Sequence, residues 1–423
     1  MNLSGEAIKP PETGVAGCGG EAPHYEPYDR VALKGTGYQT FKNSVHGKLG
    51  CVSCHNGIDN ASGDTDVAIK EKAHSGDFIA GPSIYATEKC ASCHPDIVAR
   101  THNSTHEQGW GQKSMVTLRY GIGTGADKFE QLPEELKAGY KANCQTCHGT
   151  CAECHVTRPH AGGGGLMDGH NFNKTPDMRK NCTTCHVSRG GHAYFGEGIG
   201  TVPDVHLTSA GFTCMDCHST NEVHGDGNYY DQRYKNKLKP ECVDCHSGLE
   251  TVNDYHTKHY NSFNCQTCHS QDYNNCGSCH VPEPGSGHGG ARIEAHLKFK
   301  IGMNPIPETK PYRMATLRQS LMAPDSWDGY GVATMPNFDI RPSYKYTTPH
   351  NIIRWTQRTI ADSLIDNRHP KCAQACHIIK DAEGNVHNKE YYLFESDFTE
   401  PWQSTSTNQY TVDGKLPARW QIN

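Results

Sequence analysis

Nine segments of this 423-residue chain repeat one pattern, two cysteines three positions apart with a histidine directly after the second. The cysteines are Cys51, Cys54, Cys90, Cys93, Cys144, Cys147, Cys151, Cys154, Cys182, Cys185, Cys214, Cys217, Cys242, Cys245, Cys265, Cys268, Cys276 and Cys279. The histidines are His55, His94, His148, His155, His186, His218, His246, His269 and His280. The composition would give about 0.07 such motifs by chance. Two thiols and the next imidazole can attach a haem covalently and bind its iron from one turn of backbone.

A tenth site has a wider spacing, with three residues between Cys372 and Cys376 and with His377 next. A cysteine pair that binds no haem is the alternative there. For the series as a whole, a disulfide framework and zinc ribbons are the competing interpretations. Neither requires a histidine after every cysteine pair. The sequence therefore predicts ten covalently bound haem c groups, each with an iron.

The remaining histidines are the expected source of the second axial ligands of the irons. The chain has 27 His and nine Met, so histidine is plentiful after each motif has used one. Ligation by two histidines lowers the iron potential below that of a Met/His site. Context favours ten distal candidates: His46, His74, His106, His170, His206, His224, His256, His259, His350 and His24.

The aliphatic content is too low for an ordinary core. Leu, Ile, Val and Phe make up 64 of 423 residues, about 15%, and the mean hydropathy is −0.72. No apolar stretch is long enough to span a membrane, and a pI near 6.5 disfavours a nucleic-acid partner. We therefore expect mostly irregular loops with short helices at the motifs and few strands, wrapped around a chain of stacked c-type haems. The helix content should fall below one third.

Motif spacing divides the chain into four parts. Residues 1–45 form a haem-free arm, 46–290 a haem-dense core with nine motifs, 291–390 a haem-poor segment that ends in the tenth site, and 391–423 an aromatic tail. The alternating run 296–301 predicts a strand. The tail either packs over haem edges or forms a contact surface for another subunit. Cys18 is expected to be a free or adventitiously paired thiol, and a bacterial lipoprotein processing site is the alternative.

The C-x-x-C-H series resembles the multihaem c-type cytochromes. High haem density, closely paired motifs and the haem-free arm resemble the extracellular filament-forming, or nanowire, cytochromes. That resemblance implies a secreted electron-transfer protein that polymerises with identical subunits, and His24 on the arm would complete a haem of a neighbour. Other partners would be redox proteins or extracellular acceptors such as metal oxides.

Haem attachment takes place outside the cytoplasm, so we expect an exported chain whose signal peptide is absent from this sequence. The expected location is extracellular or at the cell surface, with the periplasm as second choice. An integral membrane protein is not expected.

A multihaem reductase or oxidase of nitrogen or sulfur oxyanions is the alternative function. It would need one iron with an open coordination position. The C-x-x-C-K motif of one such enzyme group does not occur, and the spare histidines suffice to close every site. We therefore predict no catalytic residue and favour an electron conduit over an enzyme.

Overall fold

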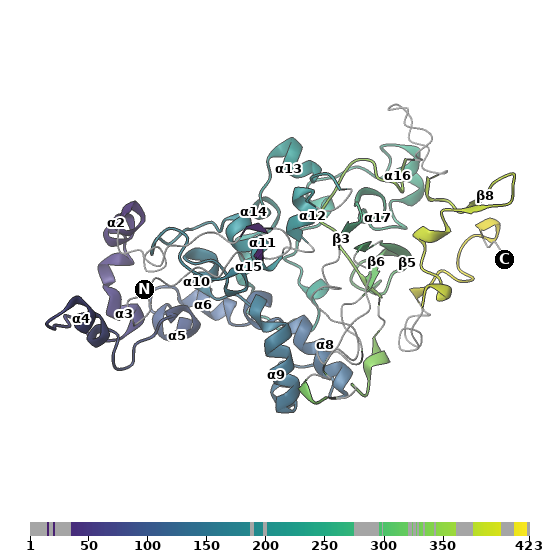
Figure 1. Ribbon diagram of the computed structural model, residues 1–423. Helices are drawn as coiled ribbons and strands as arrows, with labels where there is room; N and C mark the ends of the chain where they lie inside the picture. Colours follow the sequence, from purple (N-terminus) through teal and green to yellow (C-terminus); the bar gives the residue numbers. More distant parts are fainter. Residues whose placement is uncertain are drawn as a thin grey trace. The chain divides into compact units, whose positions relative to one another are not determined.

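The structure is a computed structural model whose elements are drawn in Figure 1. It describes residues 15–16, 20–21, 35–186, 190–197, 201–274, 296–297, 299–319, 324, 327, 330–332, 335–341, 344–360, 375–398 and 410–420. The chain forms two compact units. The first unit comprises 1–110, 143–185 and 219–230, and the second comprises 111–142, 186–218 and 231–423.

Short helices dominate the described part, which is 43% helical and 7% strand. The predicted mixture of helices and loops with few strands is therefore confirmed. Our expectation of less than one third helix is wrong, because many segments close single turns that last only three to five residues. The longest helix within the described ranges has 11 residues. No helix among the described residues is long and apolar enough to cross a membrane.

The described part of the first unit consists mainly of short helices, many of a single turn, joined by loops. Its elements are β1 (Val15–Ala16), β2 (Gly20–Glu21), α2 (Gly35–Asn43), η1 (Gly47–Leu49), α3 (Cys51–His55), α4 (Asp66–Ala73), η2 (Pro82–Tyr85), α5 (Ala86–Lys89), α6 (Pro95–Thr101), α7 (Thr105–Gln108), η4 (Gln145–Cys147), α10 (Cys151–His155), η5 (His160–Gly162), the π-helical η6 (Met178–Cys182), α11 (Thr183–Cys185) and α15 (Thr220–His224).

Polar caps rather than apolar faces start several of these helices. The Ser104 hydroxyl accepts a hydrogen bond from the backbone of Glu107, 3.1 Å away, at the start of α7. Thr150 and Glu153 form a capping box at the start of α10. Among the described residues of this unit, only Val98, Trp110 and Val156 are buried hydrophobic side chains.

The second unit contains most of the remaining elements. They are α8 (Trp110–Tyr120), η3 (Phe129–Gln131), α9 (Glu134–Asn143), α12 (His192–Phe195), α13 (Val205–Ala210), α14 (Cys214–Cys217), η8 (Arg233–Lys235), η9 (Cys242–Asp244), α16 (Asp254–His259), α17 (Gln266–His269), β3 (Tyr273–Asn274), β4 (His296–Leu297), β5 (Lys300–Met303), β6 (Met314–Gln319), η11 (Phe338–Ile340), β7 (Tyr344–Tyr346), β8 (Ile379–Lys380), β9 (Val386–His387), η13 (Lys389–Tyr391), η14 (Glu395–Asp397) and η17 (Ala418–Trp420).

A three-stranded antiparallel sheet, in the order β5–β6–β7, gives the second unit a side-chain core. Figure 1 shows β5 and β6 side by side. Ile301 lies opposite Thr316, and Leu317 lies opposite Tyr346. One apolar cluster includes Ile301 and Tyr392, and another includes Leu317. A porphyrin-only core is therefore not the arrangement of this unit. The strand predicted over 296–301 is divided between β4, which pairs with β3, and β5.

Candidate functional site

The described cysteine–histidine motifs close single turns of helix. The backbone N–H of His94 donates to the carbonyl of Cys90 over 2.9 Å, and His246 makes the same contact with Cys242. His269 donates likewise to Cys265 over 3.0 Å. The turn carries both thiols and the imidazole of a motif on one short segment. All seventeen motif cysteines in the described ranges are free of disulfide bonds.

Seven motif histidines each lie opposite a histidine from outside the motifs. The facing imidazoles have ring centres 5.9 to 6.2 Å apart. The pairs, motif histidine first, are His94 with His46, His55 with His170, His155 with His224, His246 with His206, His218 with His350, His269 with His256, and His377 with His259. A metal held between two imidazoles by bonds of about 2 Å places their ring centres roughly 6 Å apart. The spacing therefore fits one metal ion per pair.

Two protein ligands per metal suit a haem, because the porphyrin provides the other four nitrogens. A structural zinc site takes four protein ligands. Among the residues that the structure describes, no three His, Cys, Asp or Glu side chains gather around one point as metal ligands. The donor set of each pair thus fits the group that the motifs predict.

Backbone carbonyls orient several of the facing imidazoles. The Nδ1 of His55 donates to the carbonyl of Ile79 over 2.8 Å, and that of His155 donates to Asn173 over 2.7 Å. The Nδ1 of His259 donates to Tyr255 over 2.9 Å. A carbonyl only accepts, so Nδ1 carries the hydrogen and Nε2 keeps its lone pair. Such outer contacts fix the tautomer that a metal needs.

Desolvation keeps many of these imidazoles neutral at neutral pH. Burial, followed by the facing His55, lowers the pKa of His170. Desolvation, followed by the facing His218, lowers the pKa of His350 to about 4, although His350 is an exposed residue by its surface area. Burial also lowers the pKa of His269 and of His377. A neutral imidazole is the form that binds a metal.

Burial affects the motif thiols in the opposite sense, because it disfavours the charged thiolate. It raises the pKa of Cys144 to about 12 and that of Cys154 to about 11.

The structure places seven of the ten distal candidates in these pairs. His74 instead packs edge-on against Phe78 at 4.5 Å, and its Nδ1 donates to Lys70. The Nδ1 of His106 donates to the carbonyl of Val223 over 3.2 Å. The remaining predicted residues lie outside the described ranges: His24, Cys276, Cys279, His280 and Cys372, together with Cys18.

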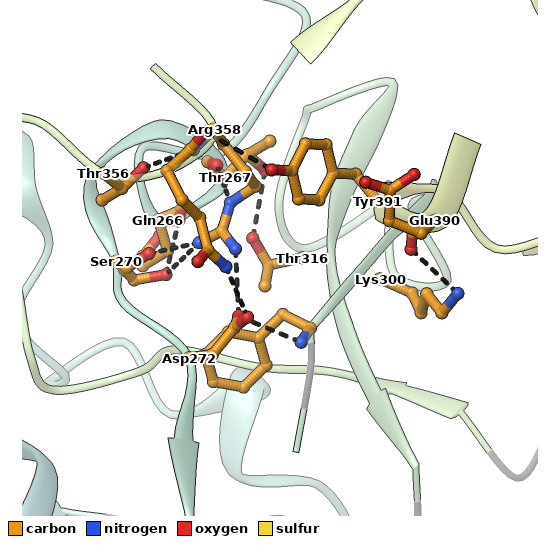
Figure 2. A network of polar contacts seen from close by, with 12 residues as sticks. Gln266, Thr267, Ser270, Asp272, Lys300, Thr316, Thr356, Arg358, Glu390 and Tyr391 are labelled. Atoms are coloured by element: carbon orange, nitrogen blue, oxygen red, sulfur yellow. Dashed lines mark hydrogen bonds and ion pairs between the residues drawn. The ribbon is translucent and has the colours of Figure 1, made fainter. Parts of the chain in front are cut away.

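A buried arginine supports the motif that ends at His269 (Figure 2). Arg358 is 2% exposed, and its Nε donates to the carbonyl of Thr267 over 2.8 Å. Its guanidinium also donates to the carbonyl of Ser270 and forms an ion pair of 3.0 Å with Asp272. Arg358 comes from a segment 90 residues later in the sequence, and no motif pointed to it.

The same segment binds the motif through its backbone. The Nδ1 of His269 donates to the carbonyl of Arg354 over 3.1 Å, and Ile353 N–H donates to the carbonyl of His269. The hydroxyl of Thr356 donates to the carbonyl of Cys268 over 2.8 Å. Residues 351–358 therefore position the imidazole and one cysteine together.

Replacing Arg358 with methionine is expected to destabilise the protein by about 3 kcal/mol, because Asp272 and two buried carbonyls lose their partner. The shift is measured by denaturant unfolding followed by circular dichroism. Arg354→Met is the matched control, since Arg354 is an exposed arginine of the same segment. Its effect should stay within about 0.5 kcal/mol. Equal midpoints for the two variants would contradict the supporting role of Arg358.

Comparison of the chain with family models, curated proteins and solved structures finds no match, so the geometry of the paired imidazoles carries the functional argument.

Proposed function

We propose that this chain is an electron-transfer protein that carries ten c-type haems, mainly held by two histidines each. The observation that carries the proposal is the set of facing imidazoles. Each of the seven pairs joins one motif histidine to one histidine from elsewhere in the chain, at nearly the same spacing. Unrelated surface histidines have no reason to meet in this way.

A bound haem would supply an iron that takes up and releases one electron. The chain's own residues would hold that iron from both sides. A site closed by two imidazoles leaves no position for a substrate, which favours a conduit over the oxyanion reductase or oxidase. Catalytic metals keep one position open.

Contacts between motifs support transfer from site to site. The sulfur of Cys185 lies within interaction distance of that of Cys147, although 38 residues separate them. Cys242 and Cys265 are related in the same way. Groups attached at these cysteines would be close neighbours. Short gaps between carriers are what a conducting chain requires.

Exposed apolar side chains accompany the paired imidazoles. Val45, next to His46, is 77% exposed, and Leu49 is 50% exposed. Val243, inside a motif, is 45% exposed. Large apolar side chains are rarely left in water in such number beside one kind of site. A porphyrin face would cover them.

The extracellular, filament-forming form of the proposal rests on the resemblance of the motifs and the N-terminal arm to the nanowire cytochromes. Identical subunits would be the main partners, with redox proteins or metal oxides as acceptors. Part of the aromatic tail has a contact within the chain, since Trp420 packs 4.5 Å from the His377 ring and near Tyr392. Negative-stain images that show only discrete particles would contradict the filament.

Mass spectrometry and carbon monoxide binding of the purified native protein test the main proposal. We expect a mass increase equal to ten haems, a low-spin spectrum and no carbon monoxide complex. A mass that lacks haem would overturn it. A high-spin component that binds carbon monoxide or nitrite would favour the enzyme.

A further inference from the structure

One facing imidazole is hydrogen-bonded to a carboxylate rather than to a backbone carbonyl. The Nδ1 of His206 donates to Oδ1 of Asp204 over 2.8 Å. Asp204 is 2% exposed, and the same oxygen accepts the backbone N–H of His206 at 2.8 Å. The other oxygen accepts the backbone N–H of Ile352 at 2.6 Å. The carboxylate thus has three donors and almost no contact with water.

In four of the other pairs, the Nδ1 atom of one imidazole faces a neutral backbone carbonyl instead. These imidazoles are those of His55, His155, His259 and His269. Among the described residues, three further carboxylates lie near histidines. Glu107 is 3.2 Å from His102, Asp381 is 2.8 Å from His387 and Glu197 is 3.8 Å from His192, but none of these histidines belongs to the seven facing pairs.

We infer that Asp204 sets the reduction potential of the site formed by His206 and His246, making it harder to reduce than it would be with a neutral partner. This inference rests on the proposed function. An iron held by His206 and His246 would lose one positive charge on accepting one electron from a neighbouring iron, and no bond would break. A buried negative charge behind the ligand stabilises the more positive, oxidised form. A carboxylate partner also makes the imidazole a stronger donor to its metal.

The position of the site gives this tuning a consequence for transfer. The Cys242 thiol of the same motif contacts Cys265 of the following motif. Cys245, the second cysteine of the same motif, lies close enough to Cys217 of the preceding motif for their charges to interact. An electron that passes between the two flanking motifs would therefore cross a site that is harder to reduce. Asp204 would control how readily this part of the chain conducts.

Asp204→Asn in the haem-loaded protein tests the inference, because asparagine keeps the size and an acceptor oxygen but removes the charge. Potentiometric titration with visible spectra should show one haem shifted to higher potential and the others unchanged. At the original midpoint of that site, the ratio of reduced to oxidised iron should rise about tenfold, a shift of about 59 mV for one electron. The EPR signal of one low-spin iron should change as well.

Asp381→Asn is the matched control. It removes the charge from a carboxylate that also bonds an imidazole, His387, at 2.8 Å, but outside the facing pairs. Its titration should match that of the original protein. If asparagine at 204 prevents folding, Asp204→Glu retains the charge and should keep the original titration.

The outcomes separate the two proposals. A protein with ten haems and low-spin spectra, in which Asp204→Asn leaves the titration unchanged, overturns the role of Asp204 alone. A protein without covalent haem overturns the proposed function itself. A general loss of low-spin signal in Asp204→Asn that the glutamate variant shares would show a purely structural role, and it would also overturn the tuning.

Discussion

Haem-free protein, expressed without the attachment machinery, is expected to be unfolded in the first unit and to retain protected backbone amides in the β5–β6–β7 sheet. In the described part of the first unit only three hydrophobic side chains are buried. Each contributes about 1.5–3 kcal/mol, whereas ordering the backbone costs about 1–2 kcal/mol for every residue. The sheet of the second unit has its own apolar clusters around Ile301 and Leu317.

Hydrogen exchange with mass spectrometry measures this difference. Peptides from residues 51–108 and 151–185 should exchange within seconds in the haem-free chain and slowly in the loaded protein. In the haem-free chain, peptides that contain Ile301 or Leu317 should exchange at least about tenfold more slowly than these peptides of the first unit. Equal protection of the two units without haem would contradict the dependence of the first unit on its cofactor. The loaded protein is the control for peptide recovery.

The low aliphatic content of the whole chain represents the first unit better than the second. It led us to expect porphyrins as the whole core, and that expectation stays a prediction for the first unit, whose described part buries few hydrophobic side chains. The apolar residues that the chain does have are concentrated in the second unit, including Ile301, Leu317 and Tyr346. An average over 423 residues hides that concentration. The alternating run near residue 300 was its visible sign.

The candidate site shows the same limit of sequence information. Motif spacing identified one histidine of every described pair, because the C-x-x-C-H pattern is local in the sequence. The partner is not local. His46 comes just before the first motif but lies opposite His94 of the second, and His170 lies opposite His55, 115 residues away. Spare histidines could therefore be recognised as a class, while their pairing needed the fold.

No sequence motif identified the two buried charged residues that contact the candidate sites. Asp204 and Arg358 are single charged residues in ordinary contexts, and both act through contacts with distant backbone. Their burial reveals them, since an almost fully buried charge requires partners. Burial of this kind depends on tertiary structure and cannot be derived from spacing.

His350→Ala is expected to open one iron of the loaded protein to an external ligand. His350 lies opposite His218, with ring centres 6.1 Å apart, and is its facing imidazole. Alanine would remove the proposed ligand, and the motif that ends in His218 would keep the haem attached. Carbon monoxide should then bind at about one molecule per chain, and roughly a tenth of the haem absorbance should become high-spin. The unaltered protein should bind none.

Two further variants make this result decisive. His387→Ala removes a histidine whose Nε2 bonds to Asp381 and which belongs to no facing pair, so its spectrum should stay fully low-spin. His350→Met supplies a different ligand, and a six-coordinate iron of higher potential should result. If His350→Ala binds no carbon monoxide although ten haems are attached, the facing imidazoles are not the ligands. We expect His350→Ala to bind carbon monoxide, His350→Met to stay six-coordinate and His387→Ala to match the unaltered protein. These three results together would identify His218 and His350 as the two ligands of one iron.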